Sequence, residues 1–293
     1  MTSASAAPAA SVAPPALSAP RRAPSLWRAA VLIFDLSLAR MLWSRGTIFM
    51  GLLVGLPVVL ALLVRGVQAI GGPGMRVDGQ MVTGPTIFGF MVWWLYLRFI
   101  VPVLALYYGT ALVADEVEDK TITYLFTRPI RRGAVLLGKF LAYFVCTVMV
   151  VLPSLMVVYF LMGLSGATLA GTFPSLLKDL GLIILGLLAY GGLFAWVGAQ
   201  FKRPLVIGLV FVFGFEQIAL IIPGSLRNLT VSYYLQSLVP HAVMGEGVMS
   251  LLQSLVQQKA SLATAVIMLV GIGVAFVFLA MRVIARREYV LEQ

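Results

Sequence analysis

Long apolar runs alternate with short charged segments along most of the 293-residue chain. Each run is near or above the roughly 20 residues that an α-helix needs to cross the hydrocarbon core of a bilayer. The pattern therefore predicts an all-α, polytopic membrane protein with six transmembrane helices. The predicted spans are residues 46–64, 87–113, 140–162, 180–200, 205–222 and 262–281. The fifth run is short and the second is long, which predicts tilt or partial exposure at these two spans.

The first 45 residues follow a different pattern. Residues 1–24 are mostly Ala, Pro and Ser, and they have too few large apolar groups to fold alone, so we expect a disordered cytoplasmic tail. Residues 25–45 are apolar but are interrupted by charged residues, namely Arg28, Asp35, Arg40 and Arg45. This pattern suits a helix that lies in the membrane interface. The alternative is that the segment extends the first span inward.

The basic residues give an orientation. Most of the 21 Lys and Arg residues lie on the side of the membrane that carries the N-terminus when six spans are assumed. By the positive-inside rule, this distribution places both termini in the cytoplasm, including the C-terminal residues 282–293. On the opposite side, residues 223–261 contain an amphipathic stretch from Tyr233 to Gln257, which predicts a helical lip over the outer mouth.

Composition excludes a water-soluble protein and a nucleic-acid-binding protein. Apolar residues make up 61% of the chain and charged residues only 11%, whereas soluble domains have about 45–50% and about 25%. The net charge of +10 comes from residues that flank the spans and form no continuous stripe, so we expect contact with anionic lipid headgroups instead of nucleic acid. The single Cys146 and single His241 indicate neither an internal disulfide nor a metal site.

The cytoplasmic loop 114–139, between the second and third predicted spans, has an unusual charge order. Four acidic residues (Asp115, Glu116, Glu118 and Asp119) precede a basic group that begins at Arg128. Between them, the apolar Ile122, Leu125 and Phe126 have helical spacing, which predicts a short helix over residues 116–126. The apolar face suggests a surface for a partner protein. The alternative is a solvated loop whose charges only set the topology.

This loop resembles the corresponding segment of the ABC-2 type permeases, the membrane subunits of ABC exporters. The resemblance rests on Glu116, Glu118, Thr121, Arg128, Pro129, Arg132, Gly138, Lys139 and Phe140. Two positions depart from the family pattern: Lys120 stands where Gly is usual and Arg131 where Ser is usual. The motif covers about 30 residues, and the six-span layout agrees with the family over most of the chain.

The resemblance implies that residues 25–293 form one ABC-2 type membrane domain, in which residues 25–45 are an elbow helix. It also implies that the loop is a coupling helix seated in a cleft of a cytoplasmic ABC ATPase. The residues implied in this coupling are Glu116, Glu118, Asp119, Thr121, Leu125, Phe126, Arg128, Pro129, Arg132, Gly138 and Lys139. A second permease half, identical or different, and a location in a bacterial inner (plasma) membrane are further implications.

The chain itself is not expected to be an enzyme. Residues 133–139 fit the first seven positions of a phosphate-binding loop, but Phe140 replaces the Ser or Thr whose hydroxyl binds Mg²⁺. No strand is expected before this segment, and a predicted span follows it at once. We therefore expect no catalytic residues and no cofactor in this chain, and ATP to be bound by a partner subunit.

Arg98 and Glu216 are charged residues inside predicted spans. Such residues usually face a partner or water because lipid does not solvate them. They form either a buried ion pair that fixes helix packing or part of the substrate route. An alternative to the permease function is a gradient-driven secondary transporter or channel that uses Arg98 and Glu216 as an ion relay. Another rival is a membrane assembly factor that transports nothing.

Overall fold

The computed structural model describes residues 26–42, 45–70, 76–77, 80–81, 84–118, 132–163, 169–221, 225–239 and 260–286. Nearly all of these residues are helical. The α-helices are α1 (Leu26–Leu42), α2 (Arg45–Ala69), α3 (Gly84–Phe90), α4 (Val101–Glu118), α6 (Arg132–Gly163), α7 (Leu169–Gln200), α8 (Pro204–Val210), α9 (Glu216–Ile221), α10 (Val231–Leu238) and α12 (Leu262–Arg286).

The other elements are short. Two π-helices, η1 (Met91–Ile100) and η2 (Phe211–Phe215), continue directly into the α-helices on either side, and η3 (Ser225–Leu229) is a 3₁₀-helix. Strands β1 (Arg76–Val77) and β2 (Gln80–Met81) pair antiparallel, with Arg76 opposite Met81. This two-residue ladder is a small departure from the all-α prediction.

Five described helices are long and apolar enough to cross a membrane. They are Gly46–Ala69, Gly84–Leu112, Gly133–Gly163, Gly171–Gln200 and Leu262–Arg286. These segments confirm five of the predicted apolar runs as helices, most of them longer than predicted, because apolarity marks only the part of a helix that lies in hydrocarbon. The run predicted at residues 205–222 forms a shorter apolar helix, Pro204–Ala219.

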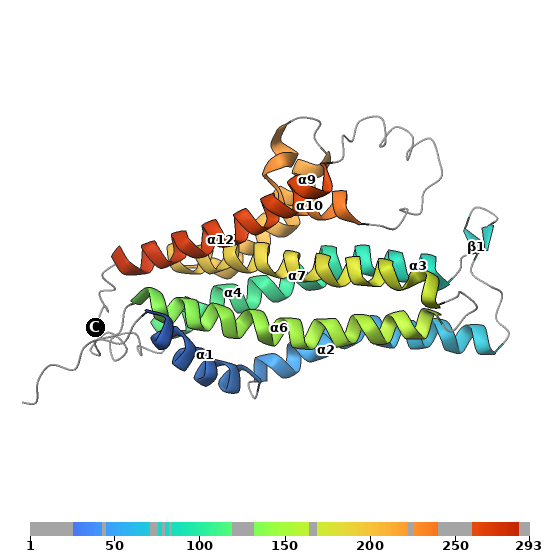
Figure 1. The fold of residues 1–293 in the computed structure, drawn as a ribbon, viewed down its shortest axis with the longest axis horizontal. Coiled ribbons are helices and arrows are strands. Elements are labelled where there is room, and N and C mark those ends of the chain that lie inside the picture. Colours follow the sequence, from blue (N-terminus) through green and yellow to red (C-terminus); the bar gives the residue numbers. More distant parts are fainter. Residues whose placement is uncertain are drawn as a thin grey trace, which may run out of the picture.

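Helix α7 lies at the centre of the bundle, where it packs against α12, α4 and α6 (Figure 1). Small residues allow these close contacts. A Cβ added to Gly192 of α7 would overlap the carbonyl oxygen of Gly273 in α12, and one added to Gly198 would lie 2.8 Å from the carbonyl oxygen of Thr110 in α4. The backbones of α7 and its neighbours are therefore in direct contact.

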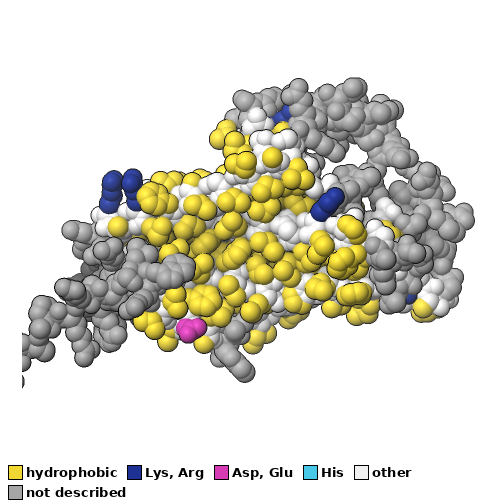
Figure 2. Space-filling model, viewed as in Figure 1, with side chains coloured by type: hydrophobic (Ala, Val, Ile, Leu, Met, Phe, Trp, Pro, Cys, Tyr) yellow, Lys and Arg dark blue, Asp and Glu magenta, His cyan; other side chains and the backbone are white. Residues whose placement is uncertain are grey.

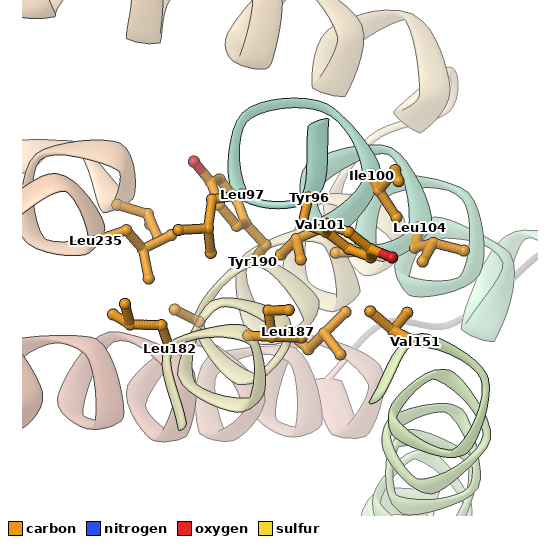
Figure 3. Close-up of a cluster of buried hydrophobic side chains, with 14 of the residues drawn as sticks. Tyr96, Leu97, Ile100, Val101, Leu104, Val151, Leu182, Leu187, Tyr190 and Leu235 are labelled. Carbon is orange, nitrogen blue, oxygen red and sulfur yellow. The ribbon is translucent and has the colours of Figure 1, made fainter. Parts of the chain in front are cut away.

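Buried apolar side chains fill the space between these helices. Figure 3 shows part of this cluster, in which Leu97 and Leu104 of the second long helix meet Leu187 and Tyr190 of α7, and Leu235 of α10. Many large apolar side chains are also exposed on the surface of the bundle, and on the face that Figure 2 shows they cover most of the described helices. Apolar side chains that remain exposed on a helical bundle indicate a lipid environment.

Helix α1 is separate from α2 and runs in a different direction (Figure 1). It packs against α6, and the contact is close because a Cβ on Gly138 would lie 2.5 Å from the carbonyl oxygen of Ala30. A helix is thus present over most of residues 25–45, and it does not continue α2 in a straight line. Its predicted place in the membrane interface stays a prediction.

Candidate functional site

The predicted coupling loop is described only at its two ends. Helix α4 ends at Glu118, and α6 begins at Arg132. Glu116 and Glu118 therefore lie in the last turn of α4, whereas we expected them at the start of a separate short helix. The other predicted coupling residues before Arg132 lie outside the described residues: Asp119, Thr121, Leu125, Phe126, Arg128 and Pro129.

The two ends of this loop are held close to each other. Lys139 of α6 donates a hydrogen bond from Nζ to the carbonyl oxygen of Leu112 in α4, at 3.4 Å. One residue earlier, Gly138 brings the backbone of α6 against α1. Helix α4 is also tied to the start of α2, because the hydroxyl groups of Tyr108 and Thr47 lie 2.9 Å apart. Both predicted residues, Gly138 and Lys139, therefore lie where α1, α4 and α6 meet.

Glu216 is the centre of a second polar site, which lies among apolar helices. Its side chain is 1% exposed. The carboxylate accepts hydrogen bonds from the Tyr190 hydroxyl at 2.5 Å and from the Ser232 hydroxyl at 2.8 Å, both at Oε2. Its Oε1 accepts from the backbone N–H of Val231 at 3.2 Å. Three donors thus satisfy a charge that would otherwise be costly to bury.

These bonds join elements that are distant in the sequence. Tyr190 is on α7, while Val231 and Ser232 are the first two residues of α10. Glu216 is the first residue of α9 and directly follows the π-helix η2. A carboxylate beside the first N–H groups of a helix is also favoured by the helix dipole. Glu216 therefore attaches the short helix α10 to the bundle.

Arg98 lies in the π-helix η1, at the centre of the Gly84–Leu112 candidate span. A charge at mid-span costs roughly 2.5–3.5 kcal/mol on insertion scales. Its Nη2 donates a hydrogen bond to Oε1 of Gln217, and its guanidinium lies 5.0 Å from the centre of the Trp94 ring. Arg98 and Glu216 thus have different hydrogen-bond partners, although Gln217, the partner of Arg98, directly follows Glu216 in the sequence.

A small pocket adjoins Arg98. It is lined by Trp93, Leu97, Arg98, Ser232 and Leu235. One cation and one hydroxyl therefore face three apolar side chains, at the junction of η1 and α10. Both π-helices lie beside the polar site, and π-helical turns often occur at functional sites because they displace side chains from regular helical positions.

Several residues of the polar site were not expected from the sequence. Tyr190, Ser232 and Gln217 are uncharged, so nothing in a linear pattern distinguishes them from other polar residues in apolar surroundings. Asp179 of α7 is charged and 0% exposed, and it lies close to the predicted start of the fourth span. A charged residue inside an apolar helix could have been identified from the sequence. It was missed because the predicted fourth span began at residue 180, so Asp179 was placed outside it.

The chain was compared with known protein families and with curated proteins. A family model described as "ABC-2 family transporter protein" matches residues 17–288. The match includes every described helix and the loop motif. The comparison with curated proteins gave no match.

Proposed function

Since the chain belongs to the ABC-2 family of transporters, we propose that it is the membrane subunit of an ATP-driven exporter. A separate cytoplasmic ABC ATPase docks on residues 115–132 and supplies the energy. The observation that carries this proposal is the family match over most of the chain. The five apolar helices that are long enough to cross a membrane support it.

The proposed topology has six spans with both termini in the cytoplasm. The apolar helix Pro204–Ala219 is the remaining span, the fifth in chain order, and its 16 residues have a rise of about 24 Å, a little less than the thickness of the hydrocarbon core. Helix α1 lies in the interface as an elbow helix. A second permease half, identical or different, completes the transport pathway in the inner (plasma) membrane of a bacterium.

The contacts around the loop support a mechanical role. Force applied to the loop would act on α4 and α6 together, because the Lys139–Leu112 hydrogen bond joins them. It would also reach α1 through the close contact at Gly138, and α7 through its packing against α4. Closure of the ATPases thereby moves the central helix of the bundle and alternates access between the two sides.

The charges of the loop match this docking role. Glu116, Glu118 and Asp119 pair with basic groups of the ATPase, and Arg128 and Arg132 pair with acidic groups or lipid headgroups. In this proposal the chain is not an enzyme, and ATP binds only to the partner subunit.

Reconstitution into liposomes distinguishes this function from its rivals. We expect solute movement only when the co-purifying ATPase and ATP are both present. Gradient-driven movement without an ATPase would instead support a secondary transporter or channel that uses Arg98 and Glu216. A complex that hydrolyses ATP but moves none of the compounds that accumulate in deletion cells would support an assembly role.

Substitution of Lys139 tests the mechanical link. Lys139→Met removes the donor to Leu112, so we expect the ATPase to dock and hydrolyse ATP while transport per ATP falls severalfold. Lys178→Met is the matched control, because Lys178 is an exposed lysine on α7 and should leave this ratio unchanged. An unchanged ratio in Lys139→Met would contradict the coupling role of this contact.

A further inference from the structure

Arg98 carries a positive charge for which the described residues supply no negative partner. Its described contacts are the amide oxygen of Gln217 and the ring of Trp94, and both partners are uncharged. The Arg98 side chain is also partly exposed, at the centre of a candidate span. A guanidinium has five N–H donors in a planar fork that matches a carboxylate or phosphate. The Gln217 contact uses one of these donors.

Among the described residues, no acidic side chain forms an ion pair with Arg98. Only Asp179 and Glu216 lie within the apolar helices, and both are buried, at 0% and 1% exposure. Glu216 already accepts three hydrogen bonds. Asp35, another described acidic residue, lies in α1.

The surroundings of Arg98 are those of an amphipathic binding site. Within the pocket, the Ser232 hydroxyl, which donates its proton to Glu216, can accept a hydrogen bond beside the cation, and Trp93, Leu97 and Leu235 supply an apolar lining. Next to the pocket, aromatic rings remain exposed, including Trp94 at 49%. Its ring centre lies 6.2 Å from that of Phe90. An anionic group and an apolar chain on one molecule would match these two parts.

We propose that this pocket binds the phosphate or carboxylate group of an acyl-chain amphiphile through Arg98, with the apolar chain lying against the exposed aromatic rings beside it. Such an amphiphile is then the class of molecule that the transporter moves. This second statement rests on the proposed function, whereas the binding site itself does not. The ligand supplies the negative charge that the described residues do not supply to Arg98, so the cation is stable in the membrane when the site is occupied.

The first test measures binding to the full-length protein in an uncharged detergent. The probe is phosphatidic acid with a fluorescent acyl chain, and diacylglycerol with the same chain is the uncharged reference. We expect phosphatidic acid to bind at least about tenfold more tightly than diacylglycerol, as one charge-assisted hydrogen bond provides. Inorganic phosphate should compete only weakly, because it lacks the apolar chain. Equal affinity for the two lipids would overturn the proposal, and full competition by inorganic phosphate would overturn the amphiphile part.

Variants assign the preference to Arg98. We expect Arg98→Gln to lose the preference for phosphatidic acid and Arg98→Lys to keep part of it, because the charge remains but the planar fork is lost. Arg65→Gln is the matched control, since it removes one positive charge at the end of α2, away from the pocket, and should keep the full preference. A preference that survives in Arg98→Gln, or that is lost equally in Arg65→Gln, would show that Arg98 is not the group that binds the anion and would overturn the proposal. If Arg98→Gln does not fold, the proposal is tested by the lipid preference of Arg98→Lys and by the comparison of the two lipids on the wild-type protein.

The outcomes separate this inference from the proposed function. Charge-dependent lipid binding without ATP-dependent transport would support the site and contradict the transport role. ATP-dependent transport that is unaffected by phosphatidic acid and by Arg98→Lys would support the transport role and overturn the statement that the bound amphiphile is the molecule transported.

Discussion

The central and peripheral helices of this bundle contrast in burial and composition. In the two central segments, Gly84–Leu112 and Gly171–Gln200, 67% and 61% of the most apolar stretch is buried within the protein. In the peripheral Gly46–Ala69 and Leu262–Arg286, the buried shares are only 24% and 22%. Nevertheless, the peripheral helices are the more apolar pair. In a water-soluble protein we would expect the opposite order, with the most buried helices the most apolar.

The contrast shows that peripheral and central helices have different surroundings and therefore different roles. Peripheral helices present large apolar side chains outward, such as Leu63 on α2 and Ile267 on α12, where lipid is the solvent. Central helices are shielded from lipid, so they can hold polar groups such as Tyr190 if those groups are hydrogen-bonded. They also contain glycines at direct backbone contacts, as at Gly192. Function is therefore expected in the central helices and membrane contact in the peripheral ones.

The largest effect is expected from Glu216→Leu, which breaks the central polar site. Three donors would lose their acceptor in a buried place, so we expect the free energy of unfolding to fall by about 3 kcal/mol. Thermal unfolding in detergent measures this loss, and proteolysis near α10 should become faster because α10 loses its attachment.

A double-mutant cycle serves as the control. Tyr190→Phe and Glu216→Gln should couple by about 1 kcal/mol because their side chains are hydrogen-bonded. Tyr143→Phe should add to Glu216→Gln without coupling, since the Tyr143 hydroxyl donates to the carbonyl oxygen of Leu187 instead. Equal coupling for both tyrosines would contradict a specific role for the Glu216 site.

An intermediate effect is expected from Gly192→Ala. The added methyl group overlaps the backbone of Gly273, so α7 and α12 must separate at a cost of about 2 kcal/mol. The matched change is Gly271→Ala on the open face of α12, where nothing lies within 4 Å. It should raise stability slightly, because Ala favours helix over Gly by about 1 kcal/mol. Similar unfolding temperatures for the two variants would contradict the close contact.

The smallest effect is expected from Ile267→Ala on the peripheral face. The side chain is 69% exposed, so in detergent we expect the free energy of unfolding to change by no more than about 0.5 kcal/mol. Leu269→Ala, two residues along the same helix and 0% exposed, is the informative comparison, because it leaves a cavity. A large loss for Ile267→Ala would indicate that this face is covered by another protein chain instead of lipid.

The helices were predictable from the sequence to different degrees. Five apolar runs were recognised by their length, because each is longer than the apolar stretch that a helix of a soluble protein needs. The separate helix at residues 25–45 was recognised by the charged residues that interrupt it. Helix ends were less predictable, as at the third span, which begins at Gly133 instead of residue 140. The reason is that a helix continues past the hydrocarbon boundary with residues that hydropathy does not count. The role of the loop 115–132 stays a prediction.

The candidate site was predictable only at its two charged residues. Arg98 and Glu216 were identified because a charge in an apolar run is conspicuous, but their partners were not identified. Tyr190, Gln217 and Ser232 come from three different segments, and no spacing along the chain relates them. Their hydrogen bonds depend on how α7, α9 and α10 pack, which a single sequence does not reveal.

The sequence by itself determined the membrane class, the helical composition and the resemblance to ABC-2 permeases, because these depend on local composition, run length and a short motif. Only the tertiary structure decided which helices are central, that Glu216 attaches α10 to α7, and that the Arg98 pocket has no acidic partner among the described residues. These features depend on distances between segments far apart in the chain. Side-chain chemistry fixes what each residue can bind, whereas packing fixes which groups it meets.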